Sequence, residues 1–204
     1  MYAYIVFYSR YGNTAKMADA VAEGVDSVDG IHSDLACVRD TITPPEVIEN
    51  DERWKEMKER LEADYPPFDI EKFKNASALV MGSPTRFGNM SAQLKSIWDR
   101  TAGLWFEGAL IDKIGAVFTC TASLHGGQET TPVTMYMPMI HHGMIPVGVP
   151  YSEQRLVSTT GGGTPYGASA VVGAASDQPP DETELAIART LGERVGRLTV
   201  KLHG

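Results

Sequence analysis

The sequence predicts an α/β protein whose parallel sheet is covered by helices on both faces. Short runs of β-branched and aromatic residues alternate with amphipathic segments along the whole chain, which is typical of repeated strand–helix–strand units. The strand-like runs are apolar throughout, as expected for strands buried on both faces. A length of 204 residues and an apolar content of 43% suit one globular domain. We therefore expect residues 1–204 to form a single domain.

The predicted elements follow one another in a regular order. In the first half of the chain, strands are expected at residues 4–8, 35–38 and 78–82, and helices at 14–25 and 91–101. In the second half, strands are expected at 114–119 and 145–149, and helices at 128–140 and 183–202. Pro138 is expected to break the helix that contains it, and Pro146 indicates an edge or strand-entry position.

Two segments fall outside this alternation. Residues 46–64 hold eight acidic and four basic side chains, spaced for an exposed helix with i,i+4 pairs such as Glu56 with Arg60. This stretch lies in a charged surface insertion at about 45–75. The insertion is either a solvent-exposed surface segment or an acidic docking patch, and the sequence leaves both interpretations open. Residues 158–176 are rich in Gly, Thr, Ser and Ala, which indicates either a loop packed on a neighbouring subunit or a free linker.

Composition excludes several classes of function. The 26 acidic and 18 basic residues give a net charge of −8, which argues against nucleic-acid binding and against docking on anionic lipid. No apolar run approaches the roughly 18 residues of a membrane-spanning helix. The N-terminus lacks the features of a signal sequence, and the two cysteines have no paired spacing. We expect a cytoplasmic protein without a metal site.

The loop of residues 9–14 joins the first strand to the first helix. Hydroxyls at Ser9 and Thr14, a turn glycine at Gly12 and a helix N-terminus together could cradle a phosphate. A tight turn capped by Asn13 or Thr14 explains the same residues equally well. The GxGxxG and GxxxxGK[ST] motifs are absent, so a mononucleotide fits better than NAD or ATP as the tightly held ligand.

Two further loops follow the third and fourth strands. Residues 83–91 carry Arg86 and Phe87 at the apex of a turn stiffened by proline and glycine, which favours a flat heterocyclic ligand over a plain turn capped by Ser91. Residues 119–128 are small and let backbone approach a ligand closely. Cys120 is interpreted as a packed residue because no paired base is visible. Ligands of parallel sheets bind at this edge.

Three other side chains deserve a functional interpretation. Trp105 stands among glycines rather than in helical periodicity, so it is either a core aromatic or the wall of a pocket for a planar substrate. His141 and His142 are adjacent and lack the i,i+4 spacing of a helical metal pair. One of them could line a pocket while the other faces away.

Taken together, these motifs resemble a known family. The first loop resembles the phosphate loop of flavodoxins. More specifically, five motifs resemble the WrbA family of flavodoxin-like NAD(P)H:quinone oxidoreductases, in the right order over nearly the whole chain; they are residues 84–90, 103–105, 125–129, 141–144 and 162–168. Tyr11 stands where ordinary flavodoxins carry Thr or Ser, which favours the WrbA-like branch. The third loop differs from the shorter, Gly-rich loop of some members, so which of its N–H groups face the flavin stays open.

The resemblance implies a flavodoxin-like three-layer sandwich with a five-stranded parallel sheet, an FMN cofactor and a homotetramer. It implies two-electron reduction of quinones by NADH or NADPH. Because both partners would stack on the same exposed flavin face, we expect ping-pong kinetics, and because two electrons are delivered at once, we expect a role in protection against redox-cycling quinones. The FMN would be bound by Ser9, Arg10, Tyr11, Gly12, Asn13, Thr14, Pro84, Thr85, Arg86, Phe87, Gly88, Cys120, Thr121, Ala122, Ser123, Leu124, His125, Gly126 and His141. Tyr11, Trp105 and His141 would contact the substrates, and Trp105 could serve the flavin of a neighbouring subunit. No catalytic side chain is required, because the flavin carries the chemistry.

Two other functions remain open at this point. A one-electron carrier of the flavodoxin type suits the acidic charge, but it needs neither the extra segments nor Trp105. A non-catalytic regulatory binding protein would bind FMN without oxidising NAD(P)H. The sequence does not choose between NADH and NADPH.

Overall fold

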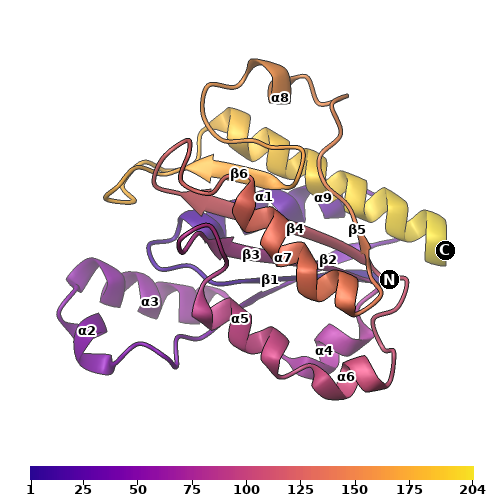
Figure 1. Cartoon of the computed structure of the whole chain (residues 1–204), viewed down its shortest axis with the longest axis horizontal. Coiled ribbons are helices and arrows are strands. Elements are labelled where there is room, and N and C mark those ends of the chain that lie inside the picture. The colour runs from indigo at the N-terminus through magenta and orange to yellow at the C-terminus, as the bar shows by residue number, and fades with distance from the viewer.

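The computed structural model describes residues 1–204 and contains one parallel sheet (Figure 1). Its strands are β1 (Tyr2–Phe7), β2 (His32–Cys37), β3 (Ala78–Pro84), β4 (Ile114–Thr121), β5 (Ile145–Pro146) and β6 (Ala168–Val171). The order is β2-β1-β3-β4-β5, and β6 also pairs with β4. All pairings are parallel, so the predicted sheet is confirmed.

The fifth position of the sheet is divided between two short strands. β5 pairs with the first two residues of β4, and β6 pairs with the last four. The expected strand at 145–149 thus ends at Pro146, and residues 168–171, expected in a loop, form a strand instead. Residues 147–167 leave the sheet between them and include α8 (Arg155–Ser158). The Val149 N–H donates to the Pro165 carbonyl at 3.0 Å, so this excursion opens and closes at the same place.

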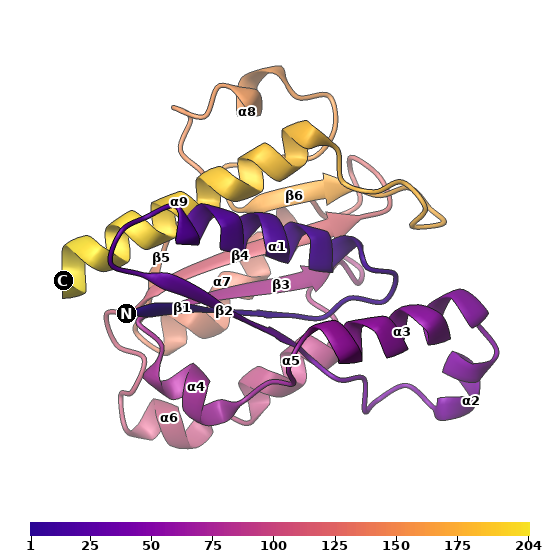
Figure 2. The ribbon, with the colours of Figure 1, turned by 180° about the vertical axis from the view of Figure 1, so that it is seen from behind.

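Helices cover both faces of the sheet. α1 (Asn13–Asp26) and α9 (Glu182–His203) pack on one face (Figure 2). On the other lie α4 (Ile70–Asn75), α5 (Ala92–Asp99), α6 (Ala102–Phe106) and α7 (Thr130–His141). Along β1, Ile5 and Phe7 enter one core while Tyr4 and Val6 enter the other. A strand buried on both faces has this alternation.

Two expectations about helices were wrong. α7 continues through Pro138 to His141 because proline removes only one helical hydrogen bond, and the buried Met135 and Met139 hold the helix against the sheet. Trp105, expected outside helical periodicity, lies in the short helix α6.

α1 and α9 approach each other closely. A Cβ added at Gly24 would lie 2.0 Å from the Arg189 carbonyl oxygen, and one at Gly192 would lie 2.0 Å from that of Val21. Only glycine permits this backbone-to-backbone contact. The contact fixes α1, whose N-terminus carries the first predicted loop.

The first part of the charged insertion forms two helices, α2 (Pro45–Glu49) and α3 (Glu52–Asp64), beside the carboxyl ends of the strands (Figures 1 and 2). Its last part is α4, whose Phe73 is buried against the sheet. The segment is not a fully solvated helix, because Trp54 and Leu61 are buried. The i,i+4 ion pairs join Lys58 to Glu62 and Arg60 to Asp64 rather than Glu56 to Arg60. None of the helices combines the length and apolar character needed to cross a lipid bilayer.

Candidate active site

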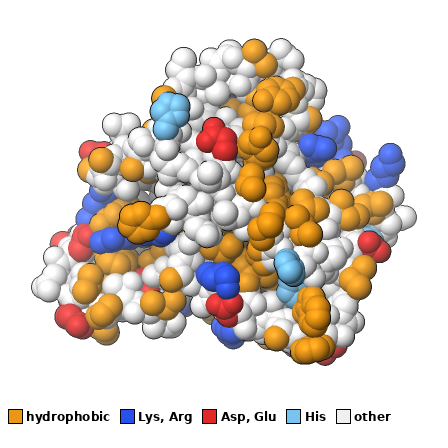
Figure 3. All heavy atoms as spheres, viewed as in Figure 1, with side chains coloured by type: hydrophobic (Ala, Val, Ile, Leu, Met, Phe, Trp, Pro, Cys, Tyr) orange, Lys and Arg blue, Asp and Glu red, His pale blue; other side chains and the backbone are white.

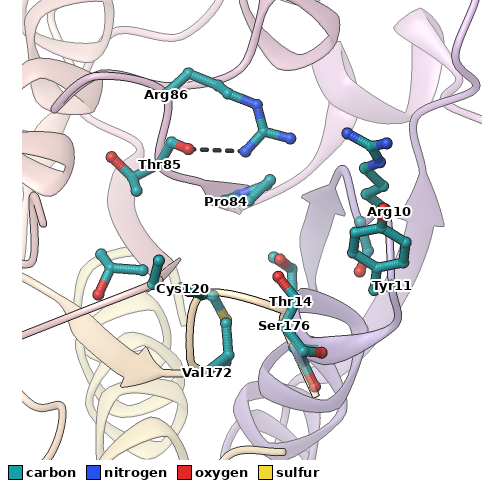
Figure 4. Close-up of a pocket in the computed structure, with 14 residues that line it drawn as sticks. Arg10, Tyr11, Thr14, Pro84, Thr85, Arg86, Cys120, Val172 and Ser176 are labelled. Atoms are coloured by element: carbon teal, nitrogen blue, oxygen red, sulfur yellow. Dashed lines mark hydrogen bonds between the residues drawn. The ribbon is translucent and has the colours of Figure 1, made fainter. Parts of the chain in front are cut away.

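A pocket of about 320 Å³ lies at the carboxyl ends of the strands (Figure 4). All three predicted loops contribute to it. Its walls are Ser9, Arg10, Tyr11, Asn13, Thr14, Pro84, Thr85, Arg86, Cys120, Thr121, Ala122, Val172, Ala174 and Ser176. No carboxylate is among them, so the lining suits an anionic ligand.

The first loop presents the N-terminus of α1 to this pocket. Gly12 adopts a left-handed conformation with φ of 86° and precedes the helix, and its N–H donates to Ser9 Oγ at 3.1 Å. No side chain caps the helix, and the N–H groups of Asn13 and Thr14 donate to no acceptor in the chain. The alternative in which Asn13 or Thr14 caps the turn is therefore wrong. Unpaired N–H groups at a helix N-terminus bind a phosphate well.

The second loop is a tight hairpin. The backbones of Arg86 and Asn89 exchange hydrogen bonds of 2.7 and 3.1 Å. Phe87 and Gly88 between them have φ of 54° and 77°, the signs that a type I′ turn requires. Phe87 is an unfavourable residue for this conformation and its side chain is fully exposed. Neither packing nor turn chemistry accounts for a phenylalanine here.

The third loop is braced from inside. The buried Gln128 donates from Nε2 to Thr121 Oγ1 at 2.6 Å, and Thr121 Oγ1 donates to the Ser123 carbonyl at 2.8 Å. Complete burial raises the pKa of the Cys120 thiol to about 12. Cys120 is therefore a neutral wall residue at pH 7 and not a nucleophile.

The fourth wall was missed from the sequence. Val172, Ala174 and Ser176 follow β6 and line the pocket. The Ser176 carbonyl accepts a hydrogen bond from Asn13 Nδ2 at 2.9 Å, which joins this segment to the first loop. The only sequence pattern that indicated a strand here was the run of small and apolar residues at 168–172, which lies within a Gly-rich segment.

Other predicted site residues lie outside the pocket walls. Gly12, Phe87, Gly88, Ser123, Leu124, His125 and Gly126 belong to its loops but do not line it. Trp105 and His141 line a second surface hollow of about 410 Å³ between α5, α6 and α7, which shares no residue with the pocket. Trp105 Nε1 donates to the His141 carbonyl at 2.9 Å. Within one chain, the predicted flavin loops and these two side chains are therefore separate.

Comparison with known proteins gives the family. Residues 8–153 match the model of the NADPH-dependent FMN reductase family. The chain belongs to this family. A protein of Trichlorobacter lovleyi named NAD(P)H dehydrogenase (quinone) is 45% identical over 97% of both chains. A protein of the same name from Chromohalobacter salexigens is 43% identical over 98% of both. These relatives confirm the predicted membership of a family of NAD(P)H:quinone oxidoreductases.

The fold of this chain is also similar to the folds of solved structures. The flavodoxin, WrbA-like protein from Agrobacterium tumefaciens superposes with a TM-score of 0.65 at 22% identity, covering 98% of both chains. A flavodoxin from the domain Archaea gives a TM-score of 0.63 at 19% identity, covering 98% of this chain and 99% of its own. The predicted flavodoxin-like fold is confirmed. In this fold, the α1 N-terminus and the three loops form the pocket described above.

Proposed function

We propose that this protein binds FMN in the pocket and uses it to reduce quinones by two electrons with NADH or NADPH, in a ping-pong sequence. The family is described as NADPH-dependent FMN reductase, and full-length relatives are named NAD(P)H dehydrogenase (quinone). The predicted enzyme class, an oxidoreductase, and the predicted cofactor are confirmed at this level. The structural observation that carries the proposal is the uncapped N-terminus of α1 at one side of a pocket without carboxylates.

The chain's own residues fit FMN. The N–H groups of Asn13 and Thr14 would bind the phosphate, with the Ser9 hydroxyl beside them. Thr85, Arg86 and the segment from Cys120 to Ala122 would hold the ring system from two sides. FMN, when bound, supplies the hydride chemistry. The protein needs to orient it and to exclude water, and the protonated Cys120 thiol adds no competing nucleophile.

Trp105 and His141 fit this function if a second copy brings them to the pocket. Apolar side chains gather in a band over the face that carries α7 (Figure 3). Val133, Met137 and Ile140 of α7 are exposed there, with Trp105 and Phe106 on α6 also exposed. A contiguous apolar surface of this kind is typical of subunit interfaces. It supports the proposed homotetramer with active sites at subunit junctions, and the substitution Met137→Glu is expected to shift the mass measured by light scattering downward.

The compartment and physiological role belong to the same proposal. Cys37 and Cys120 are free and buried, which suits the reducing cytoplasm. Two-electron transfer would spare the cell the radicals that one-electron reduction of quinones produces, so the role would be protective.

Anaerobic stopped-flow absorbance tests the reaction. FMN-loaded protein is mixed with NADH or NADPH, the flavin absorbance band at about 450 nm is followed, and benzoquinone is then added. Rapid bleaching by a nucleotide and rapid recovery with benzoquinone are expected. If dithionite bleaches the flavin but neither nucleotide does, the reductase proposal fails and a carrier or a binding protein remains.

A further inference from the structure

Two arginines flank Tyr11 at the edge of the pocket. The guanidinium carbons of Arg10 and Arg53 lie 4.9 and 4.5 Å from the centre of the Tyr11 ring. Arg10 also stacks on Trp54 at 3.7 Å. The stacking fixes these long side chains before any ligand arrives, which lowers the entropic cost of binding.

The cluster formed by Arg10, Tyr11, Asp51, Arg53 and Trp54 carries more positive than negative charge. Asp51 is its one carboxylate, and its Oδ2 accepts from the Tyr11 hydroxyl at 2.6 Å and from Arg10 Nη2 at 3.2 Å. Arg53 donates to the carbonyl oxygens of Ala175, at 2.7 Å, and of Ser176, which are neutral. One positive charge is therefore left without a counterion, in a chain whose net charge is −8.

Two further observations indicate an anionic ligand. Arg10 Nε is buried and has no acceptor, and an unpaired buried donor is costly. Arg86 lines the same pocket, and Figure 4 shows it across the opening from Arg10. Guanidinium donors match the geometry of carboxylates and phosphates, and a phosphate monoester is the group of this kind that a nucleotide carries.

We propose that Arg10 and Arg53 bind the 2′-phosphate of NADPH and so make this enzyme prefer NADPH to NADH. NADPH differs from NADH only in that group, and arginines recognise it in other nucleotide-binding folds. In the proposed function, the N–H groups of Asn13 and Thr14 bind the FMN phosphate, which leaves the arginines for a second anion. Arg53 is itself part of α3, and Arg10 contacts Asp51 and Trp54 at the start of that helix. The identity of the ligand as a nicotinamide nucleotide rests on the proposed function.

Binding measurements test the site without turnover. FMN-loaded wild type, Arg53→Gln and Arg60→Gln are titrated calorimetrically with adenosine 2′,5′-bisphosphate and with 5′-AMP. Arg60 is the matched control, because it lies on the same helix, is 73% exposed and pairs with Asp64. Wild type and Arg60→Gln are expected to bind the bisphosphate more tightly than 5′-AMP. Arg53→Gln should bind the bisphosphate about tenfold more weakly than wild type does, while its affinity for 5′-AMP stays the same. This is the effect of losing one charge-assisted contact at an exposed site.

Kinetics provide the second readout. Arg53→Gln is expected to raise the KM for NADPH about tenfold while the KM for NADH and kcat change little. Equal binding of the two adenosine nucleotides by wild type, or an equal rise in both KM values, overturns the proposal. Weaker binding of FMN but not of riboflavin by Arg53→Gln assigns the arginine to the FMN phosphate and also overturns it. If the bisphosphate is preferred but no nucleotide bleaches the flavin, the anion site stands and the proposed reaction fails.

Discussion

Glu184 connects the stability of the fold to the pocket wall that sequence reasoning missed. Its side chain on α9 is only 3% exposed, and the carboxylate accepts three backbone hydrogen bonds. Oε1 accepts from the N–H groups of Gly162 at 2.7 Å and Val171 at 2.8 Å, and Oε2 accepts from Asp181 at 2.9 Å. Val171 ends β6 and leads directly into the wall at 172–176. The substitution Glu184→Ala should therefore destabilise the protein and weaken FMN binding together.

The expected size follows from the three orphaned N–H groups. Each costs about 1 kcal/mol when its acceptor is lost and water only partly replaces it, giving about 3 kcal/mol in all. For a domain of this size, that lowers Tm by roughly 6–12 °C. Glu184→Gln keeps one oxygen for two of the donors but turns an NH₂ group toward the Asp181 N–H, so it should cost about 1 kcal/mol.

Urea unfolding followed by circular dichroism, and FMN titration followed by fluorescence quenching, measure the two effects. Glu182→Ala is the matched control, because the Glu182 side chain lies on the same helix, is 78% exposed and pairs only with Arg189. Its free energy of unfolding is expected to change by less than about 0.5 kcal/mol. The reasoning is refuted if Glu184→Ala unfolds within about 1 kcal/mol of wild type, or if Gln is as damaging as Ala.

Three other predictions test separate features of the structure. Gly82→Ala places a Cβ 2.1 Å from the Phe118 ring and should cost about 3 kcal/mol in urea unfolding, whereas Gly103→Ala, with no neighbour within 4 Å, should be neutral or stabilising. Phe87→Asn should raise Tm slightly by relieving the positive φ while slowing quinone reduction; unchanged turnover would show that Phe87 has no role in the site. Burial, and next the neighbouring His141, lower the pKa of His142, so the unfolded chain binds more protons and stability should fall as pH drops below about 6.5. His142→Gln should lose that dependence, and an unchanged pH profile would contradict it.

The parallel sheet and three of the pocket's walls could be predicted because they depend on local patterns. A continuous apolar run such as residues 4–8 has few alternatives to a strand buried on both faces. The turn residues of the first two loops follow strands directly, and parallel strands bring their carboxyl ends to one edge. No contact between distant residues was needed for these inferences.

The remaining features depend on contacts between distant segments. Residues 168–171 form a strand because the edge of β4 beyond Gly115 is left open when the chain departs at Val147, and that vacancy is not visible in the local sequence. The burial of Trp54 follows from its stacking with Arg10, 44 positions earlier in the chain by numbering. The helical state of Trp105 likewise follows from packing of Leu104 in the core, which overrides the flanking glycines.

The two segments that depart from strand–helix alternation meet at the same place. Arg53, at the start of α3, donates to the carbonyl groups of Ala175 and Ser176, which follow β6. Asn13 of the first loop donates to the Ser176 carbonyl as well. The insertion and the segment after β6 are therefore joined to each other across the N-terminus of α1. Leu61 of the insertion and Val172 after β6 also belong to one core of the sheet, so these segments serve the fold as well as the pocket. The contacts of Arg53 hold a positive charge at the pocket edge, which fits the anionic ligand that we propose.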